Sequence, residues 1–183
     1  MVNGRNDMRA TWTNLVAALT VWMSVAGTAA AQQPTLHDEL LDRLVGRWTL
    51  TGTIAGRERT DDVTAEWTLN HQFVAVHEVS RERDADGWPA YQATAYVGWH
   101  EAKKRYVCYW LDAFGGGFVG TGFAEPRPNE LSFVFGEAGE TFHNTFVFDP
   151  AAREWKLRMD AEHQGTLQRF ARVRLTRVAR SDR

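Results

Sequence analysis

The sequence predicts an all-β fold: an antiparallel up-and-down barrel of about ten strands with one short N-terminal helix. After residue 46, apolar and polar residues alternate with a period of two, which is typical of strands with one buried face. Turn-forming residues separate the alternating segments at short intervals, so neighbouring strands are expected to pair as hairpins. Closing such a meander into a barrel removes the two exposed edges that an open sheet would leave.

The helix is predicted directly before the first strand. Thr35 is a candidate N-cap, and Gly46 is a candidate stop signal. Four leucines between these positions recur at helical spacing and share one face: Leu36, Leu40, Leu41 and Leu44. The pattern indicates an amphipathic helix of about two to three turns.

Ten segments have the alternation expected of strands. They are residues 47–54, 62–69, 73–79, 91–99, 105–112, 118–123, 131–135, 141–148, 155–161 and 170–176. In the third segment, Phe73, Ala75, His77 and Val79 are taken as the apolar, inward face. Turn signals such as Asp84–Gly87 and Asp149–Pro150 lie between the segments.

The N-terminus has the features of an exported protein. Arg5 and Arg9 precede a short apolar run at residues 15–26, and small residues follow up to Ala31. This pattern predicts a signal peptide over residues 1–31, with a membrane anchor as the alternative. Residues 32–178 then form one domain and residues 179–183 a disordered tail, and the mature protein is expected to be periplasmic or secreted.

Charge and cysteine content exclude some classes of protein. The formal net charge of −2 gives no reason to expect a nucleic acid as partner, or stable membrane insertion after signal cleavage. Cys108 is the one cysteine, so the chain has no intrachain disulfide. Because Cys108 lies in an apolar segment, a buried and inert thiol is expected. The sequence does not indicate an oligomeric state.

Several segments resemble known families. Leu44–Leu50, a short helix leading into Gly-x-Trp, is similar to the start of lipocalins and fatty-acid-binding proteins. Four further segments resemble a bacterial family catalogued as domain of unknown function 1579, in which His100 stands where Asp or Asn is usual: Tyr96–His100, Tyr106–Asp112, Phe142–Asp149 and Phe170–Val173. The resemblance implies a lipocalin-like (calycin) barrel and brings no established activity.

A barrel of about ten strands is wider than its own side chains easily fill, so an internal cavity is expected. The occupant predicted is a small hydrophobic or amphipathic molecule, although the same aromatic residues could simply pack a core. The candidate ligand-binding residues are Trp67, His77, Tyr91, Trp99, Trp110, Asp112, Phe133 and Met159.

Two of these candidates have a second interpretation. Asp112 shares a strand face with Trp110 and precedes Gly115–Gly117, so it could hold a ligand's polar group or accept backbone N–H groups of the turn. His77 could be a hydrogen-bonded core residue, a pocket acid or base, or an axial haem ligand.

Other functions therefore remain open at this stage: a haem-binding barrel, an enzyme using His77 and Asp112, or an outer sheet face that binds a partner through Tyr109 or Val107. No catalytic residue or metal ligand is assigned. The chain lacks Gly-x-Ser-x-Gly, and His–Glu neighbours on a strand point to opposite faces. The pair Asp61–Asp62 is interpreted as solvated turn residues.

Overall fold

The computed structural model describes residues 34–115, 119–137 and 139–179. The predicted signal peptide, residues 1–31, lies outside these ranges, as do residues 180–183 of the expected tail. The description below concerns the barrel domain alone.

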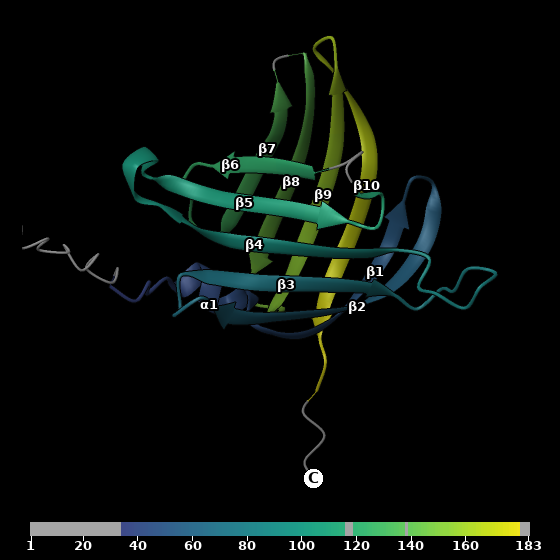
Figure 1. Ribbon diagram of the computed structural model, residues 1–183, viewed down its shortest axis with the longest axis horizontal. Helices are drawn as coiled ribbons and strands as arrows, with labels where there is room; N and C mark the ends of the chain where they lie inside the picture. Colours follow the sequence, from purple (N-terminus) through teal and green to yellow (C-terminus); the bar gives the residue numbers. More distant parts are fainter. Residues whose placement is uncertain (1–33, 116–118, 138, 180–183) are drawn as a thin grey trace, which may run out of the picture. The chain divides into compact units, whose positions relative to one another are not determined.

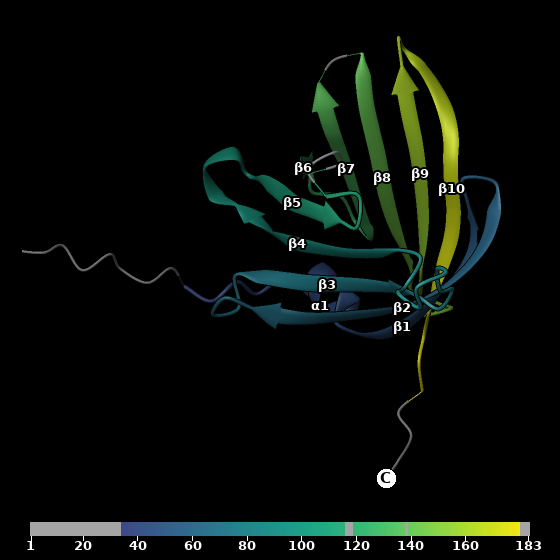
Figure 2. The ribbon, with the colours of Figure 1, turned by 45° about the vertical axis from the view of Figure 1, so that its right-hand side comes forward.

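Ten antiparallel strands form a closed barrel, which confirms the predicted fold class (Figure 1). Each strand pairs with the next in sequence, and β1 pairs with β10 to close the ring. The strands are β1 (Gly46–Ile54), β2 (Arg57–Thr68), β3 (Phe73–Ser80), β4 (Gln92–His100), β5 (Arg105–Asp112), β6 (Val119–Ala124), β7 (Glu130–Glu137), β8 (Glu140–Asp149), β9 (Glu154–His163) and β10 (Thr166–Arg177). Strands β2–β6 lie across strands β7–β10 in the ribbon (Figure 2).

The helix α1 (Glu39–Leu44) is shorter than predicted and is capped by Asp38 rather than Thr35. Asp38 Oδ1 accepts hydrogen bonds from the backbone N–H groups of Leu40 and Leu41, both at 2.9 Å. Leu36 N donates to His71 O at 3.2 Å, which fastens the segment before α1 to the β2–β3 turn, and Asp38 itself has an extended backbone. Among the described residues, no helix is long and apolar enough to cross a membrane.

Aromatic side chains fasten α1 over one end of the barrel. Trp48 Nε1 donates to Leu44 O at 2.8 Å, and Trp155 Nε1 donates to Arg43 O at 3.3 Å. Tyr106 Oη donates to Asp38 Oδ2 at 2.7 Å. Because these bonds join three strands to one short helix, α1 closes this end of the barrel.

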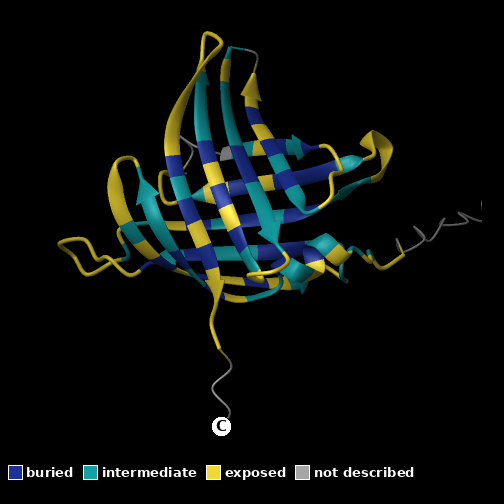
Figure 3. Cartoon of the chain, turned by 180° about the vertical axis from the view of Figure 1, so that it is seen from behind, coloured by how far each residue is buried: buried dark blue, intermediate teal, exposed yellow. Residues whose placement is uncertain are grey.

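The half of the interior next to α1 is filled. Buried and exposed residues alternate along β9 and β10, as expected when one face of each strand packs inward (Figure 3). Leu50, Phe133, Leu157 and Leu175 are almost completely buried here. The remaining free volume among the side chains of this half is about 30 Å³, close to the space of one water molecule.

Candidate ligand cavity

The other half of the barrel contains a cavity of about 580 Å³. Its lining comes from the strand ends furthest from α1, including the end of β1, the start of β2 and the end of β5. Small-molecule sites in proteins usually enclose about 300–1,000 Å³. The cavity therefore has the capacity of a ligand site, whereas the half next to α1 does not.

Much of the cavity wall is aromatic. Phe142 and Phe170 pack edge to face with ring centroids 5.3 Å apart, and Tyr91 and Phe114 lie 5.8 Å apart. The register between β9 and β10 shifts between Arg169 and Ala171, so Phe170 lies at a bulge. Such a bulge changes which face a side chain occupies, which explains why Phe170 adjoins the cavity beside Ala171 of the inner face.

Polar side chains form the floor of the cavity. Asp61 of β2 is 1% exposed, Glu78 of β3 is 6% exposed and Asn144 of β8 is 3% exposed. Glu78 and Trp110 line both the cavity and the filled half below it, so they mark the boundary between the two. The cavity thus combines an apolar wall with a small, deeply buried polar floor.

Three buried polar atoms of this floor form no hydrogen bond of ordinary geometry within the described part of the chain, although the Asp61 carboxyl group lies against Glu78 and the Trp110 indole lies near the Tyr91 hydroxyl: Asp61 Oδ1, Asn144 Oδ1 and Trp110 Nε1. Buried polar groups are paired in almost all native proteins, because leaving one unpaired costs about 1–3 kcal/mol. All three residues line one cavity, so the unsatisfied polar groups lie next to the space that a bound molecule would occupy.

The two carboxyl groups of the floor affect each other. Burial raises the pKa of Glu78 well above its ordinary value, and the hydrogen bond and negative charge of Asp61 raise it further. Glu78 therefore keeps its proton to higher pH than a solvated glutamate. Burial also raises the pKa of Tyr91, and the nearby charges of Glu78 and Asp112 add to this effect, so its hydroxyl stays neutral.

Two arginines line the cavity on the same face of β2 as Asp61. Arg57 and Arg59 are closer to the start of the strand, where β1 turns into β2, and hence closer to the open end. Arg59 forms an ion pair with Glu82. The inner face of β2 therefore has cationic groups toward the mouth and a carboxylate in the interior.

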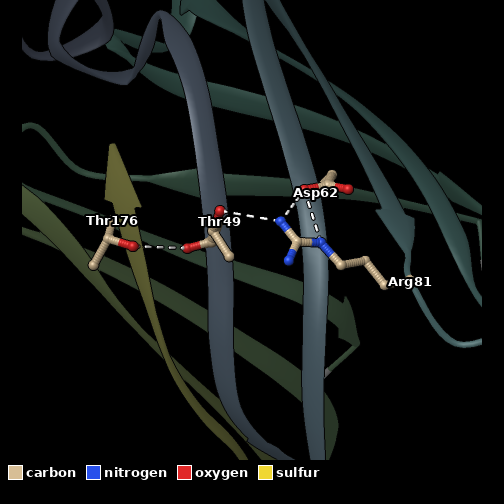
Figure 4. Close-up of polar contacts among 4 residues, drawn as sticks. All are labelled: Thr49, Asp62, Arg81 and Thr176. Atoms are coloured by element: carbon tan, nitrogen blue, oxygen red, sulfur yellow. Dashed lines mark hydrogen bonds and ion pairs between the residues drawn. The ribbon is translucent and has the colours of Figure 1, made fainter. Parts of the chain in front are cut away.

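The interpretation of Asp61–Asp62 as solvated turn residues was wrong, because β2 begins at Arg57 and includes both. Asp61 is in phase with the inward residues Val63 and Ala65. Asp62 lies on the outer face, where Arg81 Nη2 donates to its Oδ1 at 2.6 Å and reaches Thr49 Oγ1 at 3.4 Å (Figure 4). Thr176 on the neighbouring strand donates to Thr49 O.

Four of the eight predicted ligand-binding residues line the cavity: Tyr91, Trp110, Asp112 and Met159. Both interpretations of Asp112 are compatible with its position, since Oδ1 accepts from Phe114 N at 2.9 Å while the residue borders the cavity. Phe133 is buried in the filled half next to α1.

Trp67 and Trp99 lie near α1, away from the cavity. Trp67 Nε1 donates to Asp42 Oδ1 at 2.8 Å, and its ring stacks on His71. Trp99 Nε1 donates to Glu101 Oε2 at 2.8 Å, and its ring meets Tyr106 edge to face. Both indoles help to hold the closed end of the barrel.

The inward face predicted for β3 was wrong. Glu78 lines the cavity, so its neighbour His77 is on the outer face, where Nδ1 hydrogen-bonds with Thr94 Oγ1 at 3.1 Å. The outer face of β3 is also apolar, because Phe73 packs near Tyr109 and Ala75 is buried. His77 and Asp112 therefore do not share the cavity. The geometry gives no support to His77 as a haem ligand facing the cavity, or to an enzyme that uses both residues in one pocket.

Sequence reasoning missed Arg57, Arg59, Asp61, Glu78 and Asn144 as cavity residues. The sequence of β2 contained a usable signal. Val63 and Ala65 point inward, and counting back from Val63 in steps of two reaches Asp61, Arg59 and Arg57. Cys108 is buried as predicted, and burial raises the pKa of its thiol to about 12.

Within the described residues, no group of three or more His, Cys, Asp or Glu side chains could hold a metal ion. No family model matches the chain, and no curated protein matches it. The resemblance to domain of unknown function 1579 and to the lipocalins therefore stays a prediction, and the function has to be argued from the cavity.

Proposed function

We propose that this protein binds a small amphipathic molecule inside its barrel. The observation that supports the proposal best is the 580 Å³ cavity, in which aromatic walls surround a floor of buried, unpartnered polar atoms. Proteins recognise small molecules in this way, with apolar surface for affinity and a few placed polar groups for orientation.

The arrangement of the lining suggests how the ligand is oriented. Phe142, Phe170 and Met159 offer apolar contact to its body. Asp61, Asn144 and Trp110 offer hydrogen bonds to its polar group at the floor. An amphipathic molecule satisfies both sets at once, whereas a purely apolar one leaves the floor unpaired.

The test is a titration with Nile red, a neutral apolar dye that becomes fluorescent in apolar sites. Met159→Trp enlarges a wall residue and reduces the cavity, while Val134→Trp adds the same indole to the outer face of β7, where Val134 is 40% exposed. We expect saturable binding to the wild type and to Val134→Trp, and binding at least about tenfold weaker to Met159→Trp.

Circular dichroism and thermal unfolding check that both variants retain the fold. Binding that does not saturate in the wild type, or that is equal in the wild type and a folded Met159→Trp, would contradict an internal site. Loss of dye binding in Val134→Trp alone would place the dye on the outer surface.

A further inference from the structure

The floor of the cavity offers an excess of hydrogen-bond acceptors. Asp61 Oδ1 and Asn144 Oδ1 are buried and unpartnered, and Glu78 adds a second carboxyl group. Among the three unpartnered atoms of the floor, Trp110 Nε1 is the one donor. A ligand that pairs with this floor must therefore bring mainly N–H or O–H donors.

The floor also has a negative charge, and none of the cations in the described part of the chain forms an ion pair with it. One proton on Glu78 leaves the Asp61–Glu78 pair with a single negative charge. No ion pair within the described residues includes Asp61; Arg59 is paired with Glu82, and Arg57 is one step nearer the mouth. A buried charge without a cationic partner is costly, so a cation bound beside it is favoured.

We infer that the molecule held in the barrel is an amphipathic amine, whose protonated nitrogen lies on the floor against Asp61, Glu78 and Asn144. This inference rests on the proposed binding function and specifies its ligand class. An ammonium group has three N–H donors and a positive charge, so it meets both requirements of the floor. The aromatic side chains of the wall accommodate the apolar body.

Other polar groups meet these requirements less well. A hydroxyl group has one donor and no charge, so it leaves the charge of Asp61 uncompensated. A carboxylate has no donor and is repelled by Asp61, although Arg57 and Arg59 could attract it to the mouth of the cavity. Three molecules with the same body and different polar groups therefore separate these cases.

The experiment is displacement of Nile red by 4-phenylbutylamine, 4-phenylbutan-1-ol and 4-phenylbutyrate at neutral pH. For the wild type we expect the amine to compete at least about tenfold better than the alcohol, since the ammonium group has a positive charge and three donors where the alcohol has one neutral donor. The carboxylate is expected to be the weakest competitor. Equal competition by amine and alcohol, or the best competition by the carboxylate, would overturn the inference.

Two neighbouring aspartates provide a matched pair of variants. Asp61→Asn removes the charge of the floor, and Asp62→Asn removes the adjacent charge on the outer face, which is held by Arg81. The preference for the amine over the alcohol should disappear in Asp61→Asn and persist in Asp62→Asn. A folded Asp61→Asn that keeps the full preference would overturn the inference.

Nile red distinguishes a failure of the amine inference from a failure of the proposed binding function. If Nile red binds inside the barrel and the amine has no advantage, the amine inference fails while the proposed binding function stands. If Nile red does not bind to the wild type, the proposed function fails and the amine inference fails with it. Should Asp61→Asn not fold, the comparison of the three competitors on the wild type still decides.

Discussion

At the scale of single residues, the floor of the cavity places polar side chains in the interior. Asp61 and Glu78 place two carboxyl groups in a region where most neighbours are apolar, and burial is the largest cause of the raised pKa of Glu78. Such groups lower the stability of a fold unless they are paired, and they commonly persist where binding needs them. The loss of folding stability caused by the buried carboxyl group of Glu78 should be measurable, because it depends on pH.

Replacing Glu78 with glutamine should stabilise the protein at neutral and alkaline pH and have little effect near pH 4. The folded state holds the proton of Glu78 more tightly than the unfolded state, because the pKa is raised on folding. The contribution of Glu78 to stability is therefore complete below the ordinary carboxyl pKa and is lost as the pH rises through the raised value. Glutamine resembles the protonated form at every pH.

Thermal unfolding from pH 4 to pH 9 measures this difference. Glu66→Gln, a change on the outer face of β2, is the control and should follow the pH profile of the wild type. If Glu78→Gln gave the same difference in melting temperature at every pH, Glu78 would not be the buried, protonated group described above.

At the scale of elements, α1 is held by contacts at its own ends rather than by its length. A six-residue helix is too short to be stable alone, so its formation depends on packing and capping. Asp38 has two functions in this arrangement: one carboxylate oxygen caps the helix, and the other accepts the hydroxyl of Tyr106. Asp38 therefore couples α1 to β5.

Asp38→Ala should lower the free energy of unfolding by about 2 kcal/mol, because it removes an N-cap and a hydrogen bond from a buried tyrosine. Urea denaturation measures the change. Glu39→Ala is the matched control, since Glu39 is exposed and its ion pair with Arg43 is a surface pair. An Asp38→Ala variant as stable as Glu39→Ala would contradict the role of Asp38 as a coupling residue.

The distribution of apolar residues on the two faces of each strand explains why some cavity residues could be predicted from the sequence and others could not. β9 has one clearly more apolar face, and Met159, which was predicted from this face, lies in the lining of the cavity. β5 has apolar residues on both faces, so alternation did not decide that Trp110 points inward. β3 has apolar residues on both faces, so alternation alone could not distinguish His77 from Glu78. The pair Asp61–Asp62 resembles a turn, and its pairing with both β1 and β3 shows that it lies within a strand.

At the scale of the whole molecule, the two halves of the interior are packed differently. The half next to α1 is filled by large side chains, including Trp48, Phe133 and Trp155, and provides the core. The other half is left open, with polar groups at its base. Barrel closure could be predicted from short connections and a period of two. The size and depth of the cavity could not, because they depend on how inward side chains from all ten strands fill a common space.

The most direct test of an occupied interior is the response of individual indole N–H groups to a ligand, measured by nuclear magnetic resonance. Trp110 Nε1 lies at the floor of the cavity, and Trp88, which is 69% exposed, lies in the β3–β4 connection. Adding 4-phenylbutylamine should shift the Trp110 indole resonance saturably and leave the Trp88 resonance unchanged. A Trp110 resonance that does not move at saturating amine, or a shift confined to Trp88, would contradict a ligand site inside the barrel.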